Sequence, residues 1–193
     1  MPLSSLASQY FRSITERYEQ GDLLRDVSVV EWAEPIDGEL QIRERVLSYV
    51  ALLSQDCDLE HDFNNHSDSS SKDGDKYLPF LLLCPAFPAE AFRQGKHLAE
   101  LNIPMSSHNS DAWRKLKTNN LSRYHFLPGD TAHQVPDLVV DFKQYLTIPR
   151  DIIYRSNYQK CYLATIEIVF RDNISNRFAH YLSRIGLPEL SPA

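Results

Sequence analysis

The spacing of apolar residues changes twice along the chain and divides it into elements. In residues 1–20, apolar side chains recur at intervals of three and four, which predicts an amphipathic helix that ends at Gly21. Residues 21–61 carry strand-like patterns on either side of Pro35 to Gly38, where a proline and an Asp-Gly pair indicate a turn. The second of these strands ends in a continuous apolar run, Val46 to Leu53, which is typical of a strand covered on both faces.

Polar and helical segments then interrupt the strands. Residues 62–76 are rich in Asp, Asn and Ser and predict a mobile surface loop. A third strand is expected from Tyr77 to Cys84, ended by Pro85. Residues 88–120 predict an inserted pair of helices, the second of them beginning after Ser110.

The last third returns to strands and ends in a helix. Strands are expected at 124–127, within 138–148 and from Cys161 to Ile166, and a C-terminal helix at 167–187. The pattern therefore predicts a single α+β domain over 1–193. Its architecture is expected to be an SH3-like antiparallel β-barrel or a strongly bent sheet, with a central helical insertion and terminal helices.

Composition narrows the class of protein. With 20 Lys and Arg against 26 Asp and Glu, the net charge is -6, which excludes a generally basic nucleic-acid coat but leaves room for a local basic patch. Three cysteines argue against a disulfide framework. We find no signal-peptide pattern and no apolar run near the ~20 residues of a membrane span, so we expect a cytoplasmic protein with no membrane partner.

Several fragments resemble one bacterial family. Gly21-Asp22-Leu23 resembles the entry to the first strand of the PemK/MazF-like toxins, Arg45 to Ser54 their second strand, and Leu83-Cys84-Pro85 the end of the third. Val139 to Phe142 resembles a late strand of the same family. The resemblance covers 21–60, 77–87 and 136–185 as an ordered pattern, and it implies an SH3-like barrel from a toxin–antitoxin or phage-defence type of system.

The resemblance also implies a site, with one departure. Family members cut RNA with an Arg near the second strand and a Ser or Thr after the proline of the third. Here Arg45 (or Arg43) stands where the arginine is expected, but Ala86 follows Pro85 and the hydroxyl is missing. We therefore expect a protein that binds RNA or a protein partner, with a homodimer as a further option. The alternative is an active, metal-independent endoribonuclease that uses Arg45.

A dense polar cluster follows the second strand. Cys57, Asp58 and His61 are competent ligands for zinc, so a metal site is one hypothesis, although no second close ligand pair accompanies them and no cofactor is otherwise indicated. A second hypothesis makes Cys57 the nucleophile of a hydrolase, with His61 or His125 as its base. The neighbouring acids argue against it because they raise the pKa of a thiol. In a third interpretation, Cys57 faces inward and the acids begin a turn.

Basic and aromatic residues alternate near residue 120. Arg114, Lys117, Arg123, Tyr124 and His125 together predict a surface that holds a phosphate backbone and stacks a base. The competing interpretation, which we favour, is a solvated helix face followed by a strand.

Overall fold

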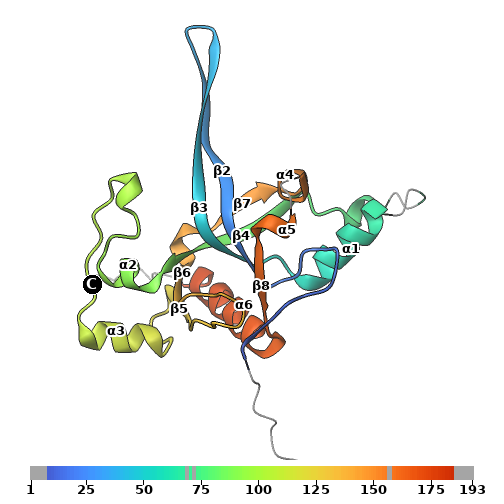
Figure 1. Ribbon diagram of the computed structural model, residues 1–193. Coiled ribbons are helices and arrows are strands. Elements are labelled where there is room, and N and C mark those ends of the chain that lie inside the picture. The colour runs from blue at the N-terminus through green and yellow to red at the C-terminus, as the bar shows by residue number, and fades with distance from the viewer. Residues whose placement is uncertain (1–7, 68–69, 71–72, 156–157, 185–193) are drawn as a thin grey trace, which may run out of the picture.

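The computed structural model describes residues 8–67, 70, 73–155 and 158–184 (Figure 1). They form an α+β fold around one strongly curled, half-barrel antiparallel sheet, as the sequence predicted. Its strands are β1 (Tyr10–Phe11), β2 (Asp22–Ile36), β3 (Glu39–Leu52), β4 (Phe80–Pro88), β5 (Tyr124–Leu127), β6 (Leu138–Asp141), β7 (Leu146–Pro149) and β8 (Tyr162–Ile166). The α-helices are α1 (Asp56–Ser67), α2 (Ala89–Arg93), α3 (Ser110–Lys117), α4 (Arg150–Arg155), α5 (Tyr158–Cys161) and α6 (Ile168–Leu182); short 3-10 turns are η1 (Gly74–Lys76), η2 (Ala99–Leu101) and η3 (Phe142–Gln144).

The sheet forks at β4. Its strand order is β1-β8-β2-β3-β4-β6-β5, and β7 also pairs with β4. The first part of β4 pairs with β7, its middle with β3, and its end with β6. The predicted end of this strand at Pro85 is wrong. Pro85 lies opposite Val50 in the β3–β4 register, at a position where its missing N–H removes no bond to β3.

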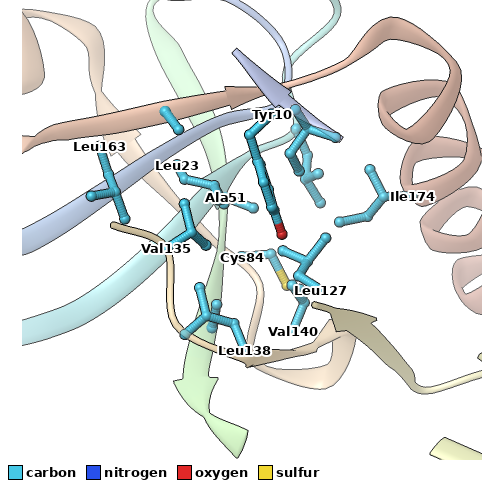
Figure 2. Close-up of a cluster of buried hydrophobic side chains, with 14 of the residues drawn as sticks. Tyr10, Leu23, Ala51, Cys84, Leu127, Val135, Leu138, Val140, Leu163 and Ile174 are labelled. Carbon is cyan, nitrogen blue, oxygen red and sulfur yellow. The ribbon is translucent and has the colours of Figure 1, made fainter. Parts of the chain in front are cut away.

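Both faces of the inner sheet are buried. Ala51 and Leu53 lie in one core cluster, and Val50 and Leu52 lie in the other, which is the two-sided burial predicted for the end of this strand. The first cluster, drawn in Figure 2, lies between the sheet and α6, where Ile174 points toward the other labelled side chains. A third cluster fixes the helical insertion on the sheet through Phe92, Leu116 and Phe126, among others.

The outer halves of β2 and β3 leave the body as a two-stranded arm (Figure 1). Asp37 and Gly38 form its tip with φ of 52° and 85°, the left-handed pair that an Asp-Gly hairpin turn requires. Most side chains beyond Val29 and before Leu47 are exposed, including several apolar ones. The register here pairs β2 only with β3.

Two predicted elements differ from the structure. The predicted N-terminal helix is wrong for residues 8–20, which form β1 and a loop; residues 1–7 lie outside the described residues. Tyr10 is instead buried as a strand residue and donates a hydrogen bond to Pro128 O (2.8 Å), while Ile14, expected on the buried helix face, is 98% exposed. The predicted loop at 62–76 is wrong for 62–67, which complete α1. Asp62, fully buried against Arg150, anchors this polar helix in a way that composition does not reveal.

The other helical segments lie near their predicted places. The segment 88–120 contains α2, η2 and α3, and Asn109 caps α3 by accepting a hydrogen bond from Ala112 N (2.9 Å). Helix α6 lies within 167–187, of which residues 185–187 are outside the described part. No helix in the described part of the chain is long and apolar enough to cross a membrane.

Candidate functional site

A cleft opens where β3 and β4 separate. The two strands pair only over Tyr49 to Leu52 of β3. Beyond the pair of Tyr49 with Ala86, β4 turns away from β3 and pairs with β6. The gap is closed from the side by the helical insertion, and the resulting cleft measures about 220 Å³. Its walls come from β3 (Arg45 to Tyr49), the end of β4 (Pro85 to Pro88), Ala91 and the segment around η2 (Lys96, His97, Leu98, Glu100 and Leu101).

A second hollow continues the cleft along the arm. It measures about 350 Å³ and extends to Arg43 and Glu31. It shares five lining residues with the cleft: Arg45, Val46, Ser48, Glu100 and Leu101. The two hollows together form one groove, called here the β3 groove, that follows β3 from Arg43 to Tyr49. The cleft alone is smaller than the ~300–1,000 Å³ of a small-molecule pocket, so its dimensions suit one or two side chains of a larger partner.

Two arginines in the β3 groove share one carboxylate. Arg45 Nε lies 3.1 Å from Glu31 Oε1, and Arg43 Nε lies 3.2 Å from Glu31 Oε2. Glu44 lines the same hollow, so two carboxylates balance the two arginines in this part of the groove. Lys96 adds another positive charge at the wall and Glu100 a negative one. The predicted catalytic residue Arg45 therefore lines a hollow in the protein surface. Its catalytic role stays a prediction.

His97 is the histidine of the cleft, and its surroundings are apolar. Its ring stacks on Phe92 with centroids 4.1 Å apart and lies 5.0 Å from Phe87. Burial lowers the pKa of His97, so the ring is neutral at pH 7. Both ring nitrogens are buried and have no hydrogen-bond partner among the described residues. The ring is thus placed to pack rather than to exchange protons with a substrate.

The groove differs from the site implied by the toxin family in the position of its hydroxyl group. Ala86 lines the cleft after Pro85, at the position where the toxin family carries a hydroxyl, and Ser48 supplies the hydroxyl of the groove from β3 instead. Metal-independent cleavage needs a base within hydrogen-bond reach of the 2′-hydroxyl. The buried nitrogens of His97 do not meet that requirement.

The outer edge of β3 is open along this groove. Leu53 N–H donates to Leu82 O (2.9 Å), which directs the N–H and C=O groups of Ala51 and Tyr49 toward β4. This alternation is interrupted opposite Asp26 (φ 55°), because Leu47 and Val50 lie in the same core cluster although they are three positions apart. Before Tyr49, β4 does not pair with β3, and the two-residue turn at Asp37-Gly38 makes Ile36 and Glu39 a hydrogen-bonded pair, so the odd-numbered residues from Glu39 to Leu47 face β2. Val46, Glu44, Ile42 and Leu40 therefore direct N–H and C=O groups outward, and the register of the described residues pairs none of them with a second strand on that side.

The predicted nucleic-acid surface is distributed over several environments. Arg114 pairs with Asp111 (2.6 Å), and Lys117 lies over the Phe126 ring (5.5 Å). Arg123 is bonded to the buried Asp141 and lies over the Tyr124 ring. The Tyr124 ring also makes a T-shaped contact with Phe92. His125 is buried. The structure does not bring these residues together as one face of free cations and an open ring.

The predicted metal ligands begin α1. Cys57 is exposed, contrary to the inward-facing interpretation, and its Sγ lies 3.8 Å from Gln55 Oε1 and from Asp58 Oδ1. Within the described ranges, no three His, Cys, Asp or Glu side chains are grouped so that they could hold an ion. His125, the alternative base for Cys57, is buried in β5 beside Phe142. The metal and nucleophile hypotheses therefore gain no support.

Sequence reasoning missed two kinds of residue. Asp56, next to Cys57, makes two 3.0 Å bonds with Arg17 and accepts from Gln20 N–H; against the effect of its burial, these bonds lower its pKa. The sequence feature that could have revealed Asp56 is its position in the acidic first turn of a helix. Lys96 and His97 were missed as groove residues, and nothing in their local pattern indicated that the insertion folds back toward β3.

Comparison with known proteins adds no relative. No family model matches this chain, and no curated protein matches it either, so the β3 groove is interpreted from its geometry alone.

Proposed function

We propose that this protein acts by binding, and that the β3 groove accepts an extended segment of a partner protein as an added strand. The observation that carries the proposal is the unpaired outer edge of β3, which stays a regular strand from Glu39 to Leu52 after β4 has left it. Strand addition takes its affinity from main-chain hydrogen bonds and its specificity from pockets for alternate side chains. The cleft supplies such a pocket, with Leu47, Tyr49, Phe87 and Leu98 among its lining.

The charges of the groove favour a peptide over RNA. Arg43, Arg45 and Lys96 are accompanied by Glu31, Glu44 and Glu100 along the same walls, so the groove offers little net charge to a phosphate backbone. The whole chain is also acidic. A mixed surface of this kind matches a segment that carries both apolar and charged side chains.

The resemblance to PemK/MazF-like toxins extends the proposal. In a divergent member of that family, the partner is a protein of a toxin–antitoxin or phage-defence system. This extension rests on the resemblance alone, together with the position of Arg45 in the groove and of Ala86 after Pro85.

A single proline substitution on the outer edge of β3 tests strand addition. Random twelve-residue peptides displayed on phage are selected on the full chain with excess Val46→Pro protein as competitor. Val46→Pro removes an outward N–H at an edge position that tolerates proline, whereas Val46→Ala keeps it. Selected peptides should bind wild type and, more weakly, Val46→Ala, and should slow amide exchange at Glu44 and Val46.

Two outcomes overturn the proposal. One is that no peptide distinguishes Val46→Ala from Val46→Pro while circular dichroism shows both variants folded. The other is that a single-stranded RNA incubated with the protein is cut in a way that Arg45→Ala abolishes, which would establish the ribonuclease alternative.

A further inference from the structure

Strand β3 is amphipathic across the two faces of the arm. The register Pro35–Leu40, Ala33–Ile42, Val30–Glu44 and Ser28–Val46 places these residues on one face, because residues directly opposite each other share a face. Leu40 and Ile42 are 65% and 54% exposed there. The opposite face of β3 carries Glu39, Gln41, Arg43 and Arg45. An apolar strip of this kind on a free ribbon is unusual unless another surface covers it.

The two edges of the arm are not equivalent. On β2, Asp26 has a left-handed φ of 55°, Glu31 interrupts the register, and Pro35 lacks an N–H. Bulges and prolines are the devices that keep an edge strand from pairing. The described residues of β3 contain no proline and no positive φ between Glu39 and Leu52. The structure therefore protects the β2 edge and leaves the β3 edge available.

We propose that two copies of this chain associate through the outer arm, with β3 pairing antiparallel to β3 of the second copy about a two-fold axis at Gln41. In this register Glu39 of each copy lies opposite Arg43 of the other, and Leu40 lies opposite Ile42. Both charged pairs are then opposite in sign, and both pairs on the other face are apolar. Arg43 is suited to this role because it shares Glu31 with Arg45 and is half exposed.

Other registers are less complementary. An axis at Arg43 sets two arginines against each other, and an axis at Glu44 opposes Arg43 to Arg45. An axis at Ile42 opposes Leu40 to Glu44. Like charges directly opposite each other are destabilising in a sheet. The axis at Gln41 avoids all three conflicts and leaves the cleft from Arg45 to Tyr49 free.

The proposed pairing stops at two copies. After β3 has paired with its symmetry mate, the outer strands of the joined arms are the two copies of β2, whose edges are protected. A two-fold contact of this kind closes on itself and does not grow into a fibre. Only residues 39–43 of each copy pair in this ladder. The surface area that it buries is therefore well below the ~1,200–2,000 Å² of a stable interface, so the dimer is expected to be weak and reversible.

A charge exchange tests the register. Sedimentation of the wild-type chain up to about 1 mM should show a monomer–dimer equilibrium, since a small interface supports binding in that range. Arg43→Glu and Glu39→Arg should each weaken association at least tenfold. The double variant should restore it to within about threefold, a rescue that damage to the arm alone cannot produce.

A crosslink tests the axis. Because the N–H of Gln41 faces β2, the two copies of Gln41 meet as a non-hydrogen-bonded antiparallel pair, whose Cα atoms lie about 4.5 Å apart, within disulfide range. Gln41→Cys, in a Cys57→Ser background, should form a dimer when diamide takes two electrons and two protons from the paired thiols. Glu34→Cys is the matched control, since Glu34 lies opposite Gln41 on β2 and away from the proposed contact.

Clear results overturn the inference. A chain that stays monomeric throughout, or that crosslinks at Glu34→Cys as fast as at Gln41→Cys, excludes this contact. A double exchange that fails to restore association excludes the register. All these measurements use the protein without any peptide, so they fail or succeed independently of peptide binding in the β3 groove.

Discussion

Arg123 and Asp141 form an ion pair in which the guanidinium makes two parallel bonds to a completely buried carboxylate. Arg123 Nε donates to Asp141 Oδ1 (2.7 Å) and Nη2 donates to Oδ2 (2.6 Å). Asp141 ends β6, and its Oδ1 also accepts from Lys143 N–H (3.1 Å). The pair joins β5, β6 and η3 below the helical insertion. Arg123, predicted to contact phosphate, thus supports the fold.

Removal of Arg123 should destabilise the protein strongly. Arg123→Ala leaves the Asp141 carboxylate buried without its partner, a change that costs about 3–5 kcal/mol in comparable pairs. Arg114→Ala breaks an exposed pair with Asp111 and should cost less than about 1 kcal/mol. Urea unfolding of both variants measures the difference. Equal losses would show that the buried pair has no special role.

Asp22 should make the folded state less stable as pH rises. Burial raises its pKa to about 7, although Glu19 N–H and Thr165 Oγ1 donate to its carboxylate at 2.9 and 2.6 Å. Between about pH 4 and 7 the folded protein keeps a proton that the unfolded chain has lost. Its contribution to the free energy of unfolding therefore falls with rising pH, by up to about 1.4 kcal/mol per unit.

Comparison with Asp22→Asn isolates this effect. The free energy of unfolding of wild type relative to Asp22→Asn should decrease between pH 5 and 7 in urea titrations at fixed ionic strength. A difference that stays constant over this range would mean that Asp22 ionises in the folded protein with an ordinary pKa.

His125 should have the opposite pH dependence. Burial, followed by the nearby Arg177, lowers its pKa to about 3, and Nδ1 has no hydrogen-bond partner within the described ranges. Below about pH 6.5 the unfolded chain binds a proton that the folded protein refuses, so stability is lost as pH falls toward 3. His125→Leu should gain stability relative to wild type on acidification from pH 6.5 to 4.5. An unchanged difference would contradict the buried neutral ring.

Gly95 should be irreplaceable in the helical insertion. Its φ is 71°, and an added Cβ would lie 2.3 Å from Met105 O, a backbone atom that cannot move aside cheaply. Gly95→Ala should lower the free energy of unfolding by more than about 2 kcal/mol. Because Gly95 precedes Lys96 and His97, Gly95→Ala should also weaken peptide binding in the β3 groove. Gly74→Ala, with open space around it, is the control and should be nearly neutral.

Local patterns were sufficient for most strands and for the fold class. The Asp37-Gly38 turn, the two-sided burial of Val50 to Leu53 and the capped helix after Asn109 all depend on neighbours in sequence, and the structure has each of them. A turn residue, an apolar run or a capping side chain acts through contacts only a few positions away. Such features can be read from the chain without knowing the fold.

Other elements were decided by partners distant in sequence. Tyr10 belongs to a strand because β8, more than 150 residues away, supplies the ladder opposite it. The polar segment at 62–67 is helical because Arg150 neutralises the buried Asp62 at 2.5 Å. Arg123 is a structural cation because Asp141 lies beneath it.

The candidate site belongs to this second class. The sequence alone determined that the chain is acidic overall, that Arg45 lies on a long strand, and that Ala86 follows Pro85. Only the tertiary structure decided that β4 leaves β3 at Tyr49, that the insertion folds back to close a cleft, and that one strand edge stays open. Hydrogen-bond pairing between strands is a property of which segments meet, and a period of two along one strand carries no information about its neighbour.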